Sequence, residues 1–313
     1  MQNAHASDAG ERMNMRFRPG RLFSVCMAVS TGVALTIVTA AKPAAATTAD
    51  PITAYIYDNI LYQQTSNSAP TTPEGYFFDM GVYFNNAADY AHGTAFYPFH
   101  PPQSLPTGGA GSTQYDYQSS LYPSMLALHA AYPFGQYNFI AGGGSSGTTT
   151  ASINYTHDYF TTTIPYVTDF SSLNGLNPAQ NFTVDFNSFT PNSHVSEGFT
   201  FLTITNASTG AVVYTDDFLS PTSTDALILA DTLLPDTTYD YELDFSDRLN
   251  GYNWKDGSFT VQGFDLRTDG SFTTEATATP LPATWILMLS GFAGFVLIGL
   301  RGTKKNTVAI AAA

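Results

Sequence analysis

The sequence predicts an all-β protein: two β-sandwich-like domains, flanked by an N-terminal signal peptide and a C-terminal transmembrane helix. Three observations predict this class. Short runs rich in β-branched and aromatic residues alternate with Gly, Asn, Asp and Pro through residues 47–278, and no segment of that body has a long apolar period of 3.6 residues. An apolar segment also lies at each end of the chain. A strand-rich body between two hydrophobic ends is typical of an exported protein.

The body of the chain is strongly acidic. The 313 residues include 25 Asp and Glu against 11 Lys and Arg. Between residues 50 and 275, 23 carboxylates face only three basic residues: Arg248, Lys255 and Arg267. A field of that sign repels phosphate backbones and anionic lipid surfaces, which excludes nucleic acid as a partner. The aromatic content of 14% indicates a packed core rather than a disordered chain.

The N-terminal end, residues 1–46, is predicted to be a secretory signal peptide that starts at Met13 or Met15. A mostly apolar run covers residues 22–41. The basic residues that precede this run are Arg16, Arg18 and Arg21. The small residues that signal peptidase requires are Ala44 and Ala46, which predicts cleavage after Ala46. An uncleaved transmembrane anchor is the alternative.

The single cysteine, Cys26, lies inside this predicted signal peptide. The mature chain is therefore expected to contain no disulfide, no thiolate nucleophile and no cysteine-bound metal. An exported protein of this size without disulfides is compatible with a bacterial envelope, where a large core replaces covalent cross-links.

The C-terminal end, residues 276–313, has three parts: a proline-rich start, an apolar run over residues 281–300 and a basic cluster. The run has about the length needed to span hydrocarbon, and a basic end stays on the cytoplasmic side. The residues that define the first and last parts are Pro280, Leu281, Pro282, Ala283, Arg301, Lys304 and Lys305. A plain stop-transfer helix would have the same composition, and it would also leave residues 47–278 outside the cytoplasm.

This tripartite end resembles the PEP-CTERM sorting signal in its VPLPA variant. The resemblance implies an exosortase-type transpeptidase as a partner, which cleaves near the proline-rich motif and releases the protein or re-anchors it at the cell surface. It also implies a Gram-negative bacterium that secretes exopolysaccharide, and membrane contact through residues 281–300 before processing.

The second half of the body, residues 171–275, is predicted to hold six strands. They cover residues 181–187, 197–204, 211–216, 225–231, 238–247 and 258–266. The segment Leu233-Leu234-Pro235-Asp236-Thr237-Thr238-Tyr239 resembles the corner before strand F of fibronectin type III domains. The resemblance implies a β-sandwich in which the ring of Tyr239 fills the core and its hydroxyl bonds to upstream backbone. Phe186 would take the core place of that family's early tryptophan.

The first half of the body, residues 47–170, is predicted to be a separate β domain of unassigned family. It holds 15 of the 19 tyrosines, with Tyr166 at its edge, so aromatic rings must supply much of its core. A short helix is expected over residues 123–130, because Pro123 precedes good helix formers. The boundary between the two domains is expected within residues 165–178.

Two patterns that suggest chemistry have simpler explanations. Residues 143–147 match the Gly-x-Ser-x-Gly elbow of hydrolases, but three threonines and a strand pattern follow where that elbow needs a helix. We therefore expect a hairpin loop. The histidines of the body are His92, His100, His129, His157 and His194. None lies at zinc-binding spacing, so they are expected at isolated surface or turn positions, with no catalytic or cofactor site.

The strand over residues 238–245 alternates apolar residues with carboxylates. We expect Tyr239, Tyr241, Leu243 and Phe245 to face a core. Asp240, Glu242 and Asp244 would then face solvent as an acidic surface. The alternative is structural calcium, which prefers six to eight oxygen ligands. The candidate ligands are Asp216, Asp217, Asp231 and Asp236.

Nine aromatic residues crowd into residues 76–100. We expect most of them to build a β core, where aromatic cross-strand pairs are common. The alternative is that exposed rings stack on sugars, with Tyr90 and Tyr97 as the candidate contacts.

The sequence as a whole predicts an exported cell-surface or extracellular-matrix protein with a structural or adhesive role and no catalytic activity. A glycan-binding module associated with exopolysaccharide is the first alternative. An enzyme that acts on polysaccharide is the second, and it would need two carboxylates across a cleft.

Overall fold

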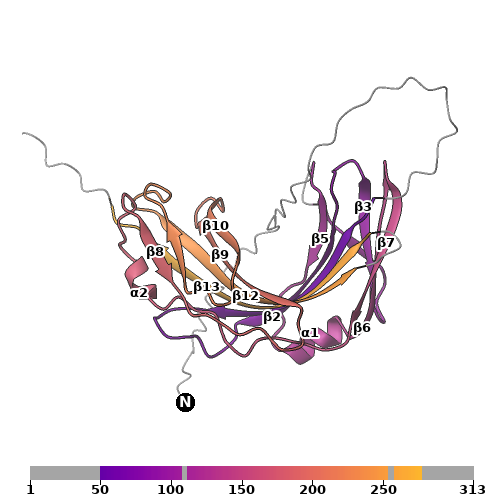
Figure 1. Ribbon diagram of the computed structural model, residues 1–313, viewed down its shortest axis with the longest axis horizontal. Helices are drawn as coiled ribbons and strands as arrows, with labels where there is room; N and C mark the ends of the chain where they lie inside the picture. Colours follow the sequence, from indigo (N-terminus) through magenta and orange to yellow (C-terminus); the bar gives the residue numbers. More distant parts are fainter. Residues whose placement is uncertain (1–49, 108–110, 253–256, 277–313) are drawn as a thin grey trace, which may run out of the picture.

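The computed structural model describes residues 50–107, 111–252 and 257–276 (Figure 1). Most of these residues lie in strands, which confirms the all-β prediction. The elements of the described part are β1 (Thr53–Gln63), β2 (Gly75–Tyr83), β3 (Tyr90–Phe96), β4 (Gln103–Leu105), β5 (Gln114–Gln118), α1 (Met125–Ala131), β6 (Gly135–Gly144), β7 (Gly147–Tyr155), α2 (Phe170–Leu173), β8 (Phe182–Asp185), β9 (Glu197–Asn206), β10 (Val212–Leu219), β11 (Asp225–Ile228), β12 (Thr238–Tyr252) and β13 (Phe259–Thr273).

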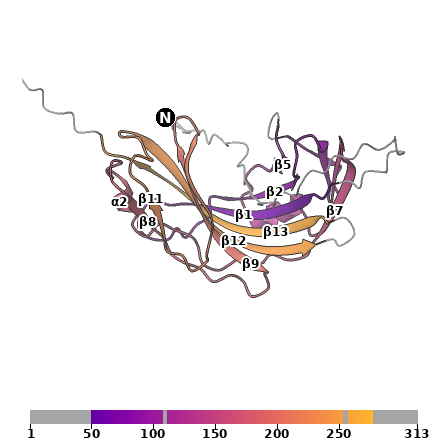
Figure 2. The ribbon, with the colours of Figure 1, turned by 45° about the horizontal axis from the view of Figure 1, so that its top comes forward.

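One curved seven-stranded sheet runs through both halves of the body, in the order β10-β9-β12-β13-β1-β2-β5. Its long strands lie side by side in Figure 2. β1 pairs in parallel with β13, with Thr53 opposite Phe259 and Gln63 opposite Asp269. The large sheet therefore contains strands from both sides of the predicted boundary within residues 165–178, whereas each smaller sheet lies on one side of it. β12 and β13 continue to Tyr252 and Thr273, past the expected strand ends at residues 247 and 266, and the pairing of β13 with β1 extends three residues into this extra length.

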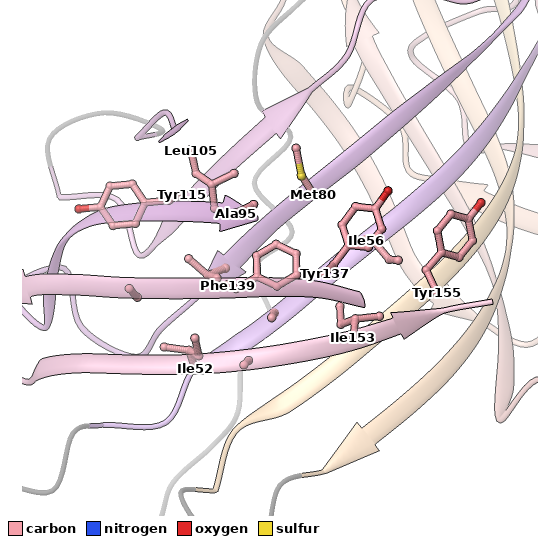
Figure 3. Close-up of a cluster of buried hydrophobic side chains, with 14 of the residues drawn as sticks. Ile52, Ile56, Met80, Ala95, Leu105, Tyr115, Tyr137, Phe139, Ile153 and Tyr155 are labelled. Atoms are coloured by element: carbon pink, nitrogen blue, oxygen red, sulfur yellow. The ribbon is translucent and has the colours of Figure 1, made fainter. Parts of the chain in front are cut away.

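Two smaller sheets pack on the same face of the large sheet, one toward each end. The four-stranded sheet β4-β3-β6-β7 encloses the first core, in which Ile56 and Met80 of the large sheet meet Phe139 and Ile153 (Figure 3). The two-stranded sheet β11-β8 encloses the second core. Phe186 is 2% exposed in that second core, as expected. The protein is thus sandwich-like at both ends, with two cores and one shared sheet.

Local signals in the sequence predict the short helix and the hairpin well. Ser124 caps α1, because its side chain accepts a hydrogen bond from the backbone N–H of Ala127 at 3.2 Å. β6 and β7 form the hairpin expected around residues 143–147. Gly143 and Gly147 have φ angles of 80° and 79°, which glycine adopts without strain.

The corner before β12 has the geometry that the sequence predicts. The ring of Tyr239 is fully buried, and its hydroxyl accepts a hydrogen bond from the backbone N–H of Leu234 at 2.7 Å. This bond ties the β11–β12 loop to the core beneath it.

Glu242 and Asp244 of β12 lie on the predicted face, away from the cores, but their predicted exposure to solvent is wrong. Glu242 is 3% exposed and Asp244 is 6% exposed. Arg267 on β13 explains this difference, because it forms an ion pair with Glu242 and lies opposite Asp244 in the β12–β13 register. Opposite charges across a strand pair favour such burial.

The predicted ends of the chain lie outside the described residues. This concerns the cleavage residues Ala44 and Ala46, and the sorting residues Pro280, Leu281, Pro282, Ala283, Arg301, Lys304 and Lys305. Within the described part, neither helix has the length and apolar character that crossing a membrane requires.

Candidate functional site

The face of the large sheet opposite the two smaller sheets is rich in charged residues, and we call it the polar face. Strand alternation places Asp79, Glu242, Asp244, Asp265 and Arg267 on it. Arg267 also donates two hydrogen bonds to Asp269, at 2.8 and 3.0 Å. Such two-point contacts fix the guanidinium within the acidic surroundings.

Two carboxylates of the polar face, Asp265 and Asp79, hold their protons more tightly than ordinary ones. Burial raises the pKa of Asp265 to about 8, although the charge of Arg248 opposes the shift. Burial also raises the pKa of Asp79 to about 7, against the opposing charge of Arg267. Asn59 donates a hydrogen bond to Asp79 at 3.1 Å. The polar face therefore carries less negative charge near neutral pH than its composition indicates.

Arg248 lies among four aromatic rings on the same face. Its guanidinium carbon is 5.0–5.5 Å from the ring centroids of Tyr57, Phe199, Phe201 and Phe218. Cation–π attraction of this kind stabilises a partly desolvated arginine. The two arginines of the described part, Arg248 and Arg267, thus both lie on the polar face.

A second group of polar side chains lies on the other side of the large sheet, and we call it the aspartate–histidine cluster. Its members are Asp58 on β1, His129 on α1, Tyr155 at the end of β7, and Asp158 just beyond it. The Tyr155 hydroxyl donates to Asp58 and lies 2.8 Å from Oδ1 of Asp158 and 3.0 Å from Nε2 of His129. Nε2 of His129 is 3.3 Å from Oδ2 of Asp158. Figure 3 shows Tyr155 at one end of the first core.

The two carboxylates of this cluster have opposite pKa shifts. Burial raises the pKa of Asp58 well above its usual value, against the hydrogen bond from Tyr155. Burial also acts to raise the pKa of Asp158, but hydrogen bonds from His129 and Tyr155 outweigh it and lower that pKa. Two carboxylates near one imidazole can hold a proton or bind a cation.

Sequence reasoning missed this cluster, because its residues come from four segments. His129 was expected at an isolated position, and that expectation is wrong. The weak local signal is the spacing of Tyr155 and Asp158, just after a strand with strict alternation. Nothing near Asp58 in the sequence indicates which residues its side chain meets.

The four carboxylates suggested as calcium ligands do not converge. Asp216 accepts a hydrogen bond from Tyr214, and Asp217 accepts one from Thr215, both within β10. Asp231 and Asp236 lie in the β11–β12 loop, each with a positive φ angle. Across residues 50–107, 111–252 and 257–276, the aspartate–histidine cluster is the one group of three His, Cys, Asp or Glu whose ligand atoms lie within 4.8 Å of one another.

The two tyrosines suggested as sugar contacts pack inward. Tyr90 is 1% exposed, and its hydroxyl bonds to Thr149 and to the carbonyl of Asp50. Tyr97 stacks on Tyr137 with a centroid distance of 5.6 Å. A sugar cannot reach the face of Tyr90, so that candidate contact is wrong. Tyr97 is partly buried and packs against the first core.

The chain matches no described protein family and no curated protein. Among solved structures it is similar to the FN1–FN3 domains of chicken CNTN1, at 11% identity over 64% of each chain, with a TM-score of 0.24. It is also similar to the BSP domain of a biofilm-associated protein, at 16% identity over 66% of this chain and 28% of the other, with a TM-score of 0.19.

A third similar structure is trypsin-activated alpha-2-macroglobulin from Escherichia coli, at 8% identity over 73% of this chain and 16% of the other, with a TM-score of 0.22. The chain spans less than two thirds of the length of each of these structures. At such TM-scores, the likeness carries no conclusion about what this chain binds or does.

Proposed function

We propose that this chain is an exported structural or adhesive protein of a bacterial cell surface or matrix. Signal peptidase would remove residues 1–46, and an exosortase-type transpeptidase would process the end after residue 276. Its role would be mechanical or adhesive rather than catalytic, with exopolysaccharide as the surrounding material.

The observation that carries the proposal is that every strand of the described part lies between the two predicted cleavage points. In chain order, the large sheet starts with β1 at Thr53 and finishes with β13 at Thr273. Cleavage after Ala46 and near Pro280 would therefore leave each of these strands intact. A body that keeps every strand after both cuts suits a protein that is processed at both ends.

The core supports the same proposal, because it is dense without covalent cross-links. Phe78 stacks on Tyr132 with a centroid distance of 4.7 Å, and Phe189 stacks on Phe245 at 4.4 Å. Aromatic pairs each add about 0.5–1.5 kcal/mol beyond their burial. Such a core can replace disulfides in an exported protein whose one cysteine lies in the predicted signal peptide.

The test is to produce the full chain in a Gram-negative host that contains an exosortase-type enzyme, and to measure its intact mass in each cell fraction. We expect surface or medium protein that begins at Thr47 and has lost the basic cluster. Replacing Arg301, Lys304 and Lys305 together by Gln should block the C-terminal cut. Thr307→Ala, two residues beyond the cluster, is the matched control and should be processed normally. Uncut precursor in the cytosol would overturn the proposal.

A further inference from the structure

We propose that Asp58, His129 and Asp158 bind one divalent metal ion of the zinc class. This inference is independent of the proposed function, because it concerns the aspartate–histidine cluster alone.

Three parts of the fold bring the ligands together. Asp58 comes from a central strand of the large sheet, His129 from α1, and Asp158 from the segment that follows β7. One ligand atom of each lies within 4.8 Å of the others. Ligands about 2.0–2.2 Å from a tetrahedral zinc ion are about 3.4 Å apart. The separation of 3.3 Å between Nε2 of His129 and Oδ2 of Asp158 already matches that value.

The charge of the cluster calls for a cation. Asp58 is 1% exposed, so its negative charge would be costly without a partner. Strand alternation places Arg248 and Arg267 on the polar face, which is the opposite side of the sheet from Asp58. A divalent ion would neutralise the carboxylates of Asp58 and Asp158 together.

Only one of the two carboxylate oxygens of Asp58 accepts a hydrogen bond in the described part of the chain. Its Oδ2 accepts from the Tyr155 hydroxyl, whereas the buried Oδ1 accepts no hydrogen bond in the described part of the chain. Buried carboxylate oxygens are almost always satisfied, so an orphaned one needs an explanation. A metal bond to Oδ1 supplies it, and Tyr155 then holds the carboxylate in orientation.

The cluster is also accessible and chemically selective. The side chains of His129 and Asp158 are 18% and 23% exposed, so an ion can enter from that side. Phe134 covers part of the site, with its ring centroid 4.6 Å from that of His129. An imidazole with two carboxylates suits zinc better than calcium or magnesium, which prefer oxygen ligands alone.

The experiment uses the purified full chain, stripped with chelator and titrated with zinc sulfate, with calcium chloride in parallel. We expect one zinc per chain by elemental analysis. At a hundredfold excess over the dissociation constant, zinc should raise the melting temperature by about 5–10 °C, and calcium should not. A stripped chain that binds no zinc would overturn the proposal, whatever the variants do.

Three isosteric variants locate the site: Asp58→Asn, His129→Gln and Asp158→Asn. Each should weaken zinc binding by at least about a hundredfold, because even partners of metal ligands contribute 10–100-fold. His92→Gln, an exposed histidine on β3, is the matched control and should bind zinc as the wild type does. Asp58→Asn keeps the shape of the side chain and can never place a charge at this buried position, so this variant should fold without metal and lose only the zinc-dependent rise. Wild-type zinc affinity in both His129→Gln and Asp158→Asn would also overturn the proposal.

Discussion

At the scale of single residues, the hydrogen bond between Tyr239 and the β11–β12 loop shows how one side chain can fix a corner. The ring is fully buried in the second core, and the hydroxyl reaches back five residues to the N–H of Leu234. Leu234 itself is 62% exposed, so hydrogen bonds of its backbone rather than contacts of its side chain hold it in place.

We predict that Tyr239→Phe lowers the free energy of unfolding by about 1–3 kcal/mol, because the Leu234 N–H loses its acceptor while the ring stays packed. Urea denaturation measures the change. Tyr159→Phe is the control, since the hydroxyl of Tyr159 makes no hydrogen bond within the described residues, and its ring also packs against the core. Equal costs for the two variants would contradict the role assigned to the Tyr239 hydroxyl.

At the scale of strands, three tyrosines of the large sheet each lie over a glycine on the neighbouring strand. The directly opposed pairs are Tyr55 with Gly81, Tyr57 with Gly263, and Tyr241 with Gly270. A β-carbon on any of these glycines would overlap the tyrosine ring. A ring over a glycine restores the contact area that glycine lacks, and it fixes the register of the pair. These glycines are therefore packing positions, although glycine ordinarily weakens a strand.

The pair on β1 and β13 gives the sharpest test, because it joins the two halves of the body. Gly263→Ala should lower the free energy of unfolding by about 1–3 kcal/mol, since the new methyl group displaces the ring of Tyr57. In a Tyr57→Leu background the same change should cost much less, and the difference measures the coupling. Urea denaturation of the four proteins completes the cycle. Identical costs in both backgrounds would mean that the ring does not limit this position.

Strand existence could be predicted from the sequence, because β-branched and aromatic runs are local signals. Strand partners could not. The alternation in β12 indicates two faces, but it does not indicate that Arg267 lies opposite Asp244 on the neighbouring strand. The burial of Glu242 and Asp244 was missed for this reason. The aspartate–histidine cluster was missed for the same reason, since Asp58 and His129 are joined only through packing between elements.

At the scale of the whole molecule, the two cores share one sheet, and this decides how the protein should unfold. The first core contains Ile56 and the second contains Leu202, but β1 and β9 belong to the same seven strands. The expectation of two separate domains would allow each half to melt alone. The continuous sheet instead couples the stability of the halves.

We therefore predict a single calorimetric transition, with equal calorimetric and van't Hoff enthalpies. Leu202→Ala, which should cost about 2–5 kcal/mol in the second core, should also weaken hydrogen-exchange protection in β6 of the first core. Leu227→Ala, at a position that is 53% exposed, is the control and should leave β6 unchanged. Two resolved transitions, or protection loss confined to the second core, would contradict the coupling.

The parallel pairing of β1 with β13 also sets when folding can finish. β1 and β13 are the first and last strands of the described part, and they are neighbours in the middle of the sheet, so a nascent chain that ends before β13 cannot complete it. Contacts between residues so distant in sequence form slowly, because the intervening chain must close a long loop. A polypeptide with this topology emerges from the ribosome unable to settle into its final form until residue 273 is present.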